Sequence, residues 1–282
     1  MKILRRFLGL MAVFSTVFAM TPASRAVEFQ SPRTLGLGGA GRAGPWLTDS
    51  IYLNPSFASY TPVYVLSGTY TGSSRGRNYN ISVQDSRTET FQAGAGFTKR
   101  DQNNAVNIGA SRAFMKTLGV GVGSKLLFDS GSGTTTADFT VSSSYIASDW
   151  LYGAVVVDNL IGGPDQTSRN LHRTVYGALK LIPTKKIGVF IDPFYSPAYS
   201  RGPKGGYHAG IELGLLDDLY FRAGKYQDAD IAHLNTRGSG FGIGGAWVGP
   251  KLSLEYAMSR ALSTHSGIGF TTAQSGSIMI FF

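Results

Sequence analysis

The stretch TLGLGGAGRAG, residues 34–44, has the residue spacing most suggestive of chemistry in this chain. Gly36, Gly38 and Gly41 match the pattern G-x-G-x-x-G, which in dinucleotide-binding proteins lets the backbone approach a pyrophosphate. Such a site also needs a strand before the glycines, a helix after them and an acidic residue about 20 positions further on. Pro45 follows the last glycine closely, where a helix interior would not tolerate it. The sequence therefore predicts no dinucleotide site and no cofactor.

Histidine chemistry is the next possibility. The chain has four histidines, which are His172, His208, His233 and His265. A hydrolase would need a nucleophile, a base and an orienting group that converge, but no G-x-S-x-G motif accompanies these histidines. A His–Ser pair formed across loops is the alternative for an outer-membrane enzyme. Asp228 and Asp230 do not have a metal-ligand spacing with any histidine, and we expect neither an enzyme nor a metal site.

The N-terminus has the features of an export signal. Residues 1–26 begin with basic side chains, continue as an apolar run over residues 7–20 and end with small Ser24 and Ala26. The apolar run is too short to span a bilayer, so we expect a cleaved signal peptide. Its removal takes away four basic residues and no acidic one, which lowers the formal net charge from +9 to +5. Neither this charge nor any basic run indicates nucleic acid, and the chain has no cysteine.

The remaining sequence indicates β-structure. Glycine makes up 37 of 282 residues and charged residues only 15%, against averages of ~7% and ~25%. Runs of about ten residues alternate apolar with small or polar side chains, which is typical of a transmembrane β-barrel. The candidate strands are residues 63–70, 79–84, 90–98, 104–112, 119–128, 136–146, 150–158, 174–182, 186–194, 206–214, 218–226, 239–248, 251–259 and 274–282. We expect an all-β, antiparallel transmembrane barrel of about 14 strands, with 12 as the alternative.

Between the later strands, short and long connections alternate. Residues 147–149, 183–185, 215–217 and 249–250 are short, whereas residues 158–173, 195–206, 227–238 and 260–272 are long. Outer-membrane barrels have short periplasmic turns and longer outer loops. If the N-terminus lies in the periplasm, the pattern places every long loop outside and returns the C-terminus to the periplasm.

Alternation also assigns the two faces of each strand. A charged side chain that faces lipid at the bilayer midplane costs ~2–4 kcal/mol, so the charged face should be the inner one. The lumen-facing charged candidates are Lys125, Lys180, Asp192, His208, Glu212, Arg222 and Glu255. They have both signs and can pair with one another.

Many inward positions are glycine. They are Gly94, Gly96, Gly109, Gly121, Gly123, Gly210, Gly214, Gly242 and Gly244. Glycine inside a strand marks a close approach of another backbone or a sharp bend. Either something fills the lumen, or the barrel is narrow and strongly curved.

The final residues, SGSIMIFF, form an apolar strand without charge. Ile278, Ile280 and Phe282 share one face of it. An exposed strand of this kind would be an aggregation hazard in a soluble protein. It resembles the C-terminal signal that the barrel-assembly machinery recognises, and a buried strand of a periplasmic sandwich is the alternative.

Residues 31–60, SPRTLGLGGAGRAGPWLTDSIYLNPSFASY, resemble the N-terminal region of the long-chain fatty acid transporter (FadL-type) superfamily, which PorV-type secretion barrels share. Asn54 and Pro55 match the family's "Y-N-P-A-G-L-A"-like box, whereas Ser56 and Phe57 depart from it. Residues 210–226 and 240–258 resemble the family's last hairpins. The resemblance implies a barrel of fourteen strands whose N-terminal segment folds inside as a plug. The chain is shorter than typical fatty acid transporters, so the outer loops that capture ligand are largely missing.

These observations give a domain plan. Residues 1–26 are the signal peptide, residues 27–62 the plug and residues 63–282 the barrel. The candidates for a plug and ligand path are Leu35, Leu37, Trp46, Asn54, Pro55 and Phe57. Phe190, Phe194 and Tyr176 would add an apolar lining to the lumen.

Two functions are compatible with this plan. The first is a passive transporter or binding channel for small hydrophobic solutes in the outer membrane of a Gram-negative bacterium. The alternative is a structural or secretion-accessory barrel that docks a protein partner of unknown identity. A water-filled porin is a further possibility, but a filled lumen would argue against it. The expected partners are the lipid bilayer, the barrel-assembly machinery and a hydrophobic ligand.

Overall fold

The structure is a computed structural model. It describes residues 29–73, 76–100, 103–129, 133–163, 171–200, 202–231, 236–264 and 271–282. The expected signal peptide lies outside these residues, as do His233 and His265. Everything that follows concerns the described residues.

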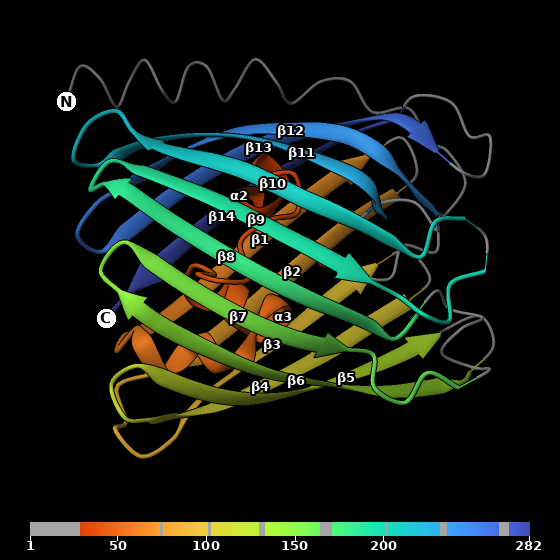
Figure 1. Cartoon of the computed structure of the whole chain (residues 1–282), viewed down its shortest axis with the longest axis horizontal. Coiled ribbons are helices and arrows are strands. Elements are labelled where there is room, and N and C mark those ends of the chain that lie inside the picture. The colour runs from red at the N-terminus through yellow and green to blue at the C-terminus, as the bar shows by residue number, and fades with distance from the viewer. Residues whose placement is uncertain are drawn as a thin grey trace.

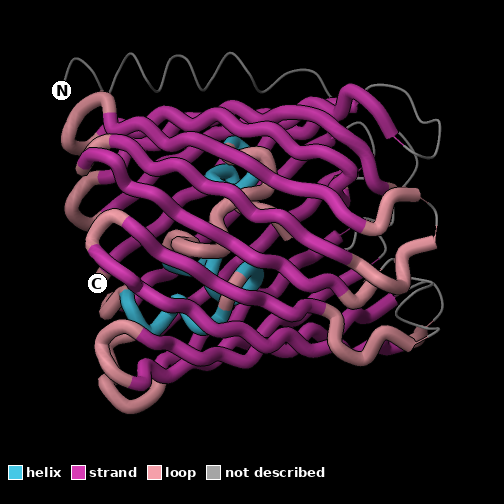
Figure 2. The backbone as a smooth tube through the Cα atoms, in the orientation of Figure 1, coloured by secondary structure: helices cyan, strands magenta, loops and turns pink. Residues whose placement is uncertain are grey.

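Fourteen strands close into one antiparallel barrel, in which each strand pairs with its neighbours in sequence and β1 pairs with β14 (Figures 1 and 2). The strands are β1 (Tyr64–Ser73), β2 (Gly76–Asp85), β3 (Gln92–Arg100), β4 (Asn103–Phe114), β5 (Leu118–Asp129), β6 (Thr135–Ser148), β7 (Leu151–Asp158), β8 (Thr174–Thr184), β9 (Ile187–Tyr195), β10 (Gly205–Gly214), β11 (Leu219–Asp230), β12 (Arg237–Val248), β13 (Leu252–Thr264) and β14 (Thr271–Phe281). Every expected strand is present, and the count of fourteen is confirmed.

The alternation that predicted the strands also determines their faces. In β5, Val120 and Val122 are exposed on the outside, while Gly121 and Gly123 between them face the lumen. In β14, Ile278 and Ile280 are exposed by 54% and 39%, and Met279 between them is buried. The outer surface is therefore apolar, as a surface in contact with lipid requires.

The observed strands reach further than expected at one end of the barrel. β6 begins at Thr135 and ends at Ser148, β11 continues to Asp230 and β13 continues to Thr264. β11 contains a bulge between Tyr226 and Ala229. A bulge disturbs the alternation of side chains while the ladder continues beyond it. The alternation of side chains in β11 therefore ends before the strand itself does.

The two ends of the barrel differ. Short connections such as residues 115–117 and 249–251 lie at one end, together with the C-terminus (left in Figure 1). The described residues of longer connections, such as 159–163, 171–173 and 196–200, lie at the opposite end. We call these the short-turn end and the long-loop end.

Residues 29–63, which we call the inner segment, lie inside the barrel (orange in Figure 1, with cyan helices in Figure 2). Their elements are α2 (Pro32–Gly36), the 3₁₀ turn η1 (Leu47–Asp49), α3 (Ser50–Leu53) and the 3₁₀ turn η2 (Pro55–Tyr60). The start of α2 follows local rules, since the Ser31 side chain accepts a hydrogen bond from the Thr34 backbone N–H and Pro32 occupies the first turn. Most of the segment is buried from solvent by the barrel wall.

One seam in the wall lacks part of its ladder. β8 and β9 pair at Tyr176–Phe194 and again at Leu179–Ile191, but Gly177 and Ala178 form no ladder pair with β9. The residues opposite them are Asp192 and Pro193. Proline has no backbone N–H to donate, so it interrupts a ladder inside a sheet.

Candidate functional site: the lumen and its inner segment

The wall glycines lie where the backbone of the inner segment approaches the wall. A Cβ atom added at Gly121 would overlap the backbone of Pro55 and Ser56, and one at Gly242 would overlap the Leu35 carbonyl. One at Gly210 would lie 2.7 Å from the Leu37 carbonyl oxygen. Any side chain at these positions would displace the segment. A filled lumen, rather than curvature alone, therefore accounts for these glycines.

Two expected glycines do not meet the inner segment in this way, and two glycines that do were missed. A Cβ atom at Gly244 would meet Ala257 and Tyr256 of β13. The nearest neighbour of a Cβ at Gly214 is Lys186, in the short turn, 3.6 Å away. Gly224 and Gly119, by contrast, approach the backbone of Leu37 and Ser56. Gly119 could have been identified from the sequence, because it continues the inward alternation of Gly121 and Gly123.

A buried ionic network joins α2 to three strands. Arg33 contacts Glu212 of β10 through two hydrogen bonds, Nε–Oε2 at 3.0 Å and Nη2–Oε1 at 3.3 Å. Arg222 of β11 donates to the same carboxylate at 2.7 Å and to Glu255 of β13 at 3.3 Å. Arg33, Arg222 and Glu255 are all less than 3% exposed. The charges balance one another, so the network holds the inner segment to the wall without leaving an uncompensated charge.

Asp49 of η1 borders this network. Its Oδ2 accepts a hydrogen bond from the Ser31 hydroxyl at 2.8 Å, and the side chain is 2% exposed. Burial, together with the nearby negative charge of Glu255, raises the pKa of Asp49 to about 7. Asp49 therefore holds a proton at mildly acidic pH, and the surrounding network is then neutral.

Asp192 of β9 holds the glycine-rich turn that opened the sequence analysis. Its Oδ2 accepts hydrogen bonds from the backbone N–H groups of Gly41 and Arg42 at 2.9 and 3.0 Å. The Arg42 guanidinium stacks 3.6 Å from the centre of the Tyr176 ring and lies 3.5 Å from the same carboxylate. The backbone donors that suggested a phosphate site thus bind a carboxylate of the barrel wall.

Asn54 and Pro55 pack against β6 and β5. The Asn54 side-chain amide donates to the Arg42 carbonyl at 2.6 Å and to the Ser144 hydroxyl at 2.8 Å. The Ser56 hydroxyl lies 2.7 Å from the Ser144 hydroxyl, and the Ser56 N–H donates to Ser142. Asn54 is fully buried. The box that resembles the family motif therefore anchors the segment to the wall.

The other expected plug residues lie in apolar contacts. Leu37 packs with Ala40 and the fully buried Phe190, and Leu35 packs with Ala257 and Ala273. Trp46 lies partly buried beside Leu47, Val65 and Met279. Phe57 contacts the rings of Tyr60 and Tyr152.

The remaining charged candidates of the lumen contact wall residues. Lys125 donates to Asp158 at 2.7 Å and to Asn159 at 3.1 Å. The Lys180 ammonium lies 5.3 Å from the Tyr152 ring centre and 5.4 Å from that of Phe190. His208 stacks beside Tyr176 and Phe194, with ring centres 6.3 and 5.4 Å apart.

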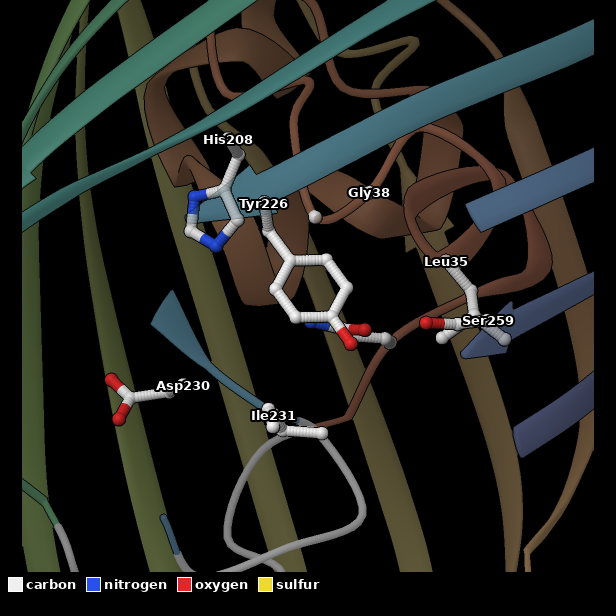
Figure 3. Close-up of a pocket in the computed structure, with 9 residues that line it drawn as sticks. Leu35, Gly38, His208, Tyr226, Asp230, Ile231 and Ser259 are labelled. Atoms are coloured by element: carbon white, nitrogen blue, oxygen red, sulfur yellow. The ribbon is translucent and has the colours of Figure 1, made fainter. Parts of the chain in front are cut away.

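An aromatic and apolar lining covers the lumen on the long-loop side of the inner segment. Its buried residues are Val156, Tyr176, Phe194, Tyr226, Ala229, Ile231 and Ala261. A cavity beside them is bordered by His208, Tyr226, Ile231 and Leu35 (Figure 3). Its volume is about 10 Å³, and that of a second cavity, between Tyr52 and Leu127, is about 20 Å³.

Cavities of this size hold about one water molecule each, whereas a benzene-sized guest occupies an engineered cavity of about 150 Å³. Neither of these two cavities, which the described residues line, therefore admits a solute larger than water unless the inner segment or the lining moves.

Other kinds of site are not built by the described residues. No group of three or more histidine, aspartate or glutamate side chains there is placed to hold a metal ion. His172 is buried against the Tyr199 ring, and its carbonyl oxygen accepts hydrogen bonds from Asn159 and Thr174. Within the described part of the chain, no helix has the length and hydropathy needed to cross a membrane.

The fold is similar to that of solved hydrocarbon channels. The CymD monoaromatic hydrocarbon channel superposes with a TM-score of 0.66 at 12% identity, over 89% of this chain and 97% of that one. The Ralstonia pickettii toluene transporter TbuX superposes with a TM-score of 0.63 at 11% identity, over 90% of this chain and 98% of that one. The Pseudomonas putida toluene transporter TodX superposes with a TM-score of 0.61 at 10% identity, over 92% of this chain and 99% of that one.

Two sequence comparisons found no relative. No family model matches the chain, and no curated protein matches it. The likeness is thus one of architecture, with a similar barrel and a similar extent of chain. The chain has a closed barrel fold similar to that of these hydrocarbon channels, which agrees with the fourteen-stranded barrel that the resemblance of its N-terminal residues implied.

Proposed function

We propose that this chain is an outer-membrane channel for small apolar solutes, and that the inner segment is a plug that closes it at rest. The observation that carries the proposal is the apolar lining beside the buried inner segment, where two cavities hold about one water molecule each, within a barrel fold similar to that of hydrocarbon channels. The long-loop end then faces the cell surface and the short-turn end faces the periplasm.

The chemistry of the lining supports apolar solutes over ions. Tyr176, Phe194 and Ile231 lie on the side from which a solute would enter. The charges deeper in the lumen are engaged with one another, as in the contact of Arg222 with Glu212. A pore that steers ions would instead present one sign of charge along its path.

The test is uptake by intact cells. A Gram-negative host that lacks hydrocarbon channels would express the chain, and the entry of a radiolabelled monoaromatic hydrocarbon would be compared with that of a polar solute of similar size. We expect entry of the hydrocarbon to rise severalfold over cells with an empty vector, while entry of the polar solute stays unchanged. Heat-modifiable migration of the extracted protein verifies that the barrel is folded in the cells that express it.

Other outcomes would favour other functions. A rise for the polar solute would indicate a water-filled porin and contradict the proposal. No rise for either solute, together with a protein that co-purifies in stoichiometric amount, would favour the docking barrel. Solvent extraction of the purified protein, with an unrelated barrel as control, adds an independent measurement of bound apolar species.

A further inference from the structure

Lys180 of β8 is a cation of the lumen that has no acid beside it. Its side chain points inward, against Gly44 of the inner segment, and is half-buried. Within the described part of the chain, no carboxylate oxygen lies within 4.0 Å of its ammonium nitrogen. Five other lumen cations form ion pairs, which are Arg33 with Glu212, Arg42 with Asp192, Lys125 with Asp158, Arg222 with Glu212 and Glu255, and Arg237 with Asp230.

Aromatic rings take the place of an acid at Lys180. Tyr152 of β7 and Phe190 of β9 pair with it from either side in the strand ladders. Their ring centres lie 5.3 and 5.4 Å from the ammonium nitrogen. The ring centre of Phe57, from the inner segment, lies 6.3 Å from that of Tyr152. Aromatic rings attract a cation but carry no net charge, so they leave the positive charge of Lys180 without a counterion.

The barrel wall beside Lys180 has no side chain at two inward positions. Gly188 of β9 lies two positions before Phe190, and Gly214 is the last residue of β10. The nearest atom to a Cβ at Gly188 would belong to the Phe190 ring, at 3.2 Å, and the nearest to one at Gly214 would belong to Lys186, at 3.6 Å. These atoms are part of the wall. The inner segment therefore does not pack on these two positions as it does on the glycines that it approaches.

The acids of the next two strands are engaged elsewhere. Asp192 of β9 binds the glycine-rich turn of the inner segment through two backbone N–H groups. Glu212 lies on β10, two strands away from Lys180, and its two carboxylate oxygens accept hydrogen bonds from Arg33 and Arg222. An anion from outside the chain can therefore bind Lys180 without displacing an existing ion pair.

We propose that Lys180 and the rings around it bind a small aromatic carboxylate of the benzoate class. One ammonium group matches one negative charge, and a carboxylic acid is ionised at neutral pH whereas a phenol is not. Tyr152 and Phe190 offer an apolar surface to the aromatic part of the ligand, as the walls of small-molecule sites do. The inference rests on the proposed function for the entry of the solute, and it extends the solutes from neutral hydrocarbons to aromatic molecules with one carboxylate.

The experiment measures ligand binding to the full-length protein in an uncharged detergent. Benzoate would be titrated at neutral pH and its affinity determined by ligand-observed NMR, with benzamide as an uncharged probe of nearly the same shape. K180M removes the charge and keeps a flexible side chain of similar length. K185M is the matched control, because Lys185 is exposed in the short turn that follows β8.

We expect the benzoate affinity of K180M to fall by at least about tenfold, and that of K185M to stay within about twofold of the wild type. The benzamide affinity of K180M should also stay within about twofold of the wild type. Unchanged benzoate affinity in K180M, or an equal loss for benzamide, would overturn the proposal. So would equally tight binding of acetate, because the aromatic rings would then have no part in recognition.

Folding is controlled separately. Heat-modifiable migration would be recorded for every variant, and K180R would keep the charge at this position. Benzoate affinity should survive this charge-conserving change to within about threefold. A loss in the folded K180R variant to the level of K180M would contradict an electrostatic contact with the carboxylate.

Uptake by cells separates this inference from the proposed function. Cells that express K180M should take up less benzoate than cells with the wild type, and as much of the neutral hydrocarbon. Hydrocarbon entry without binding of benzoate at Lys180 would overturn this inference and leave the proposed function intact. Benzoate binding that depends on Lys180, without any hydrocarbon entry, would support the inference and contradict the proposed function.

Discussion

Arg33 and Glu212 are 179 positions apart in sequence and form a bidentate ion pair inside the barrel, with contacts of 3.0 and 3.3 Å. One partner belongs to the inner segment and the other to the wall. Arg33 also donates to the Gly44 carbonyl at 3.2 Å, so it ties the turn of the segment to its own helix. The pair is therefore a charge-assisted, bidentate link between the inner segment and the wall.

Arg33→Met should loosen the inner segment. Breaking a buried ion pair by removing one partner costs ~3–5 kcal/mol in typical proteins. We expect faster hydrogen exchange over residues 31–60, while exchange in the barrel strands stays unchanged. Arg87→Met removes an exposed pair at the short-turn end and serves as the control. Wild-type exchange rates in the Arg33 variant would mean that the pair does not hold the segment.

Gly224→Ala and Gly242→Ala should each displace the inner segment. A methyl group at either position overlaps the backbone at Leu37 or Leu35, and overpacking of this kind costs ~1–3 kcal/mol. Gly68→Ala and Gly177→Ala are matched controls, because a Cβ at either has no neighbour within 4 Å. Thermal unfolding in detergent would measure the effect, and we expect lower unfolding temperatures for the first two variants than for the two controls. Equal unfolding temperatures for all four variants would contradict the close approach of the inner segment to Gly224 and Gly242.

An engineered disulfide can hold the plug in place. The hydroxyl oxygens of Ser56 and Ser144 lie 2.7 Å apart, so S56C/S144C should form a bond between η2 and β6. The chain has no cysteine of its own. If the plug must move, oxidation should reduce hydrocarbon uptake by about tenfold, and a reductant should restore it.

The control for this bond lies in the wall. The hydroxyl oxygens of Thr71 and Ser275 are 2.8 Å apart on β1 and β14, so T71C/S275C joins two strands and leaves the inner segment free. Uptake by this variant should not respond to oxidation. Full uptake through the oxidised S56C/S144C variant would show that η2 stays in place while the solute passes.

Stability of the docked segment should depend on pH through Asp49. Its pKa is raised from 3.8 to about 7 in the folded protein, so the folded state binds a proton that the unfolded state has released between these values. Docking is therefore most stable at the acidic end and weakens as pH rises, by up to ~1.4 kcal/mol per pH unit.

Hydrogen exchange of the inner segment at several pH values between about 4 and 8 would measure this effect, after correction for the intrinsic rates. Asp49→Asn should remove most of the dependence. Asp149→Asn, at an exposed turn, should leave it intact. A steeper loss of protection toward acidic pH in the wild type would contradict the assignment.

The strands could be predicted because a barrel wall leaves a periodic trace. A residue such as Val122 must face lipid and Gly123 must face the lumen, so each strand alternates along its length. The same alternation predicted which charged residues face the lumen and most of the glycines that the inner segment approaches. The alternation is lost near the long-loop end, where the bulge after Tyr226 shifts the register of β11.

The partners of the wall charges could not be predicted in the same way. The lumen-facing charges were expected to be able to pair with one another, as Glu212 and Arg222 do, but Arg33, Arg42 and Asp49 of the inner segment were not identified as partners. Their contacts join residues that are far apart in sequence, and no local period encodes such pairs. A signal was nevertheless present, since charged residues in a segment that fills a lumen need partners in the wall.

The interrupted seam at Pro193 has a mechanical consequence. A barrel wall resists deformation through its ladder, and the joint between β8 and β9 has fewer bonds per unit length than a complete joint. When the lateral pressure of the bilayer changes, the cross-section should flatten along this compliant line first. Asp192 is the neighbour of Pro193 and holds Gly41 and Arg42 from the lumen side. Flattening at this seam should therefore move the glycine-rich turn of the inner segment together with Asp192.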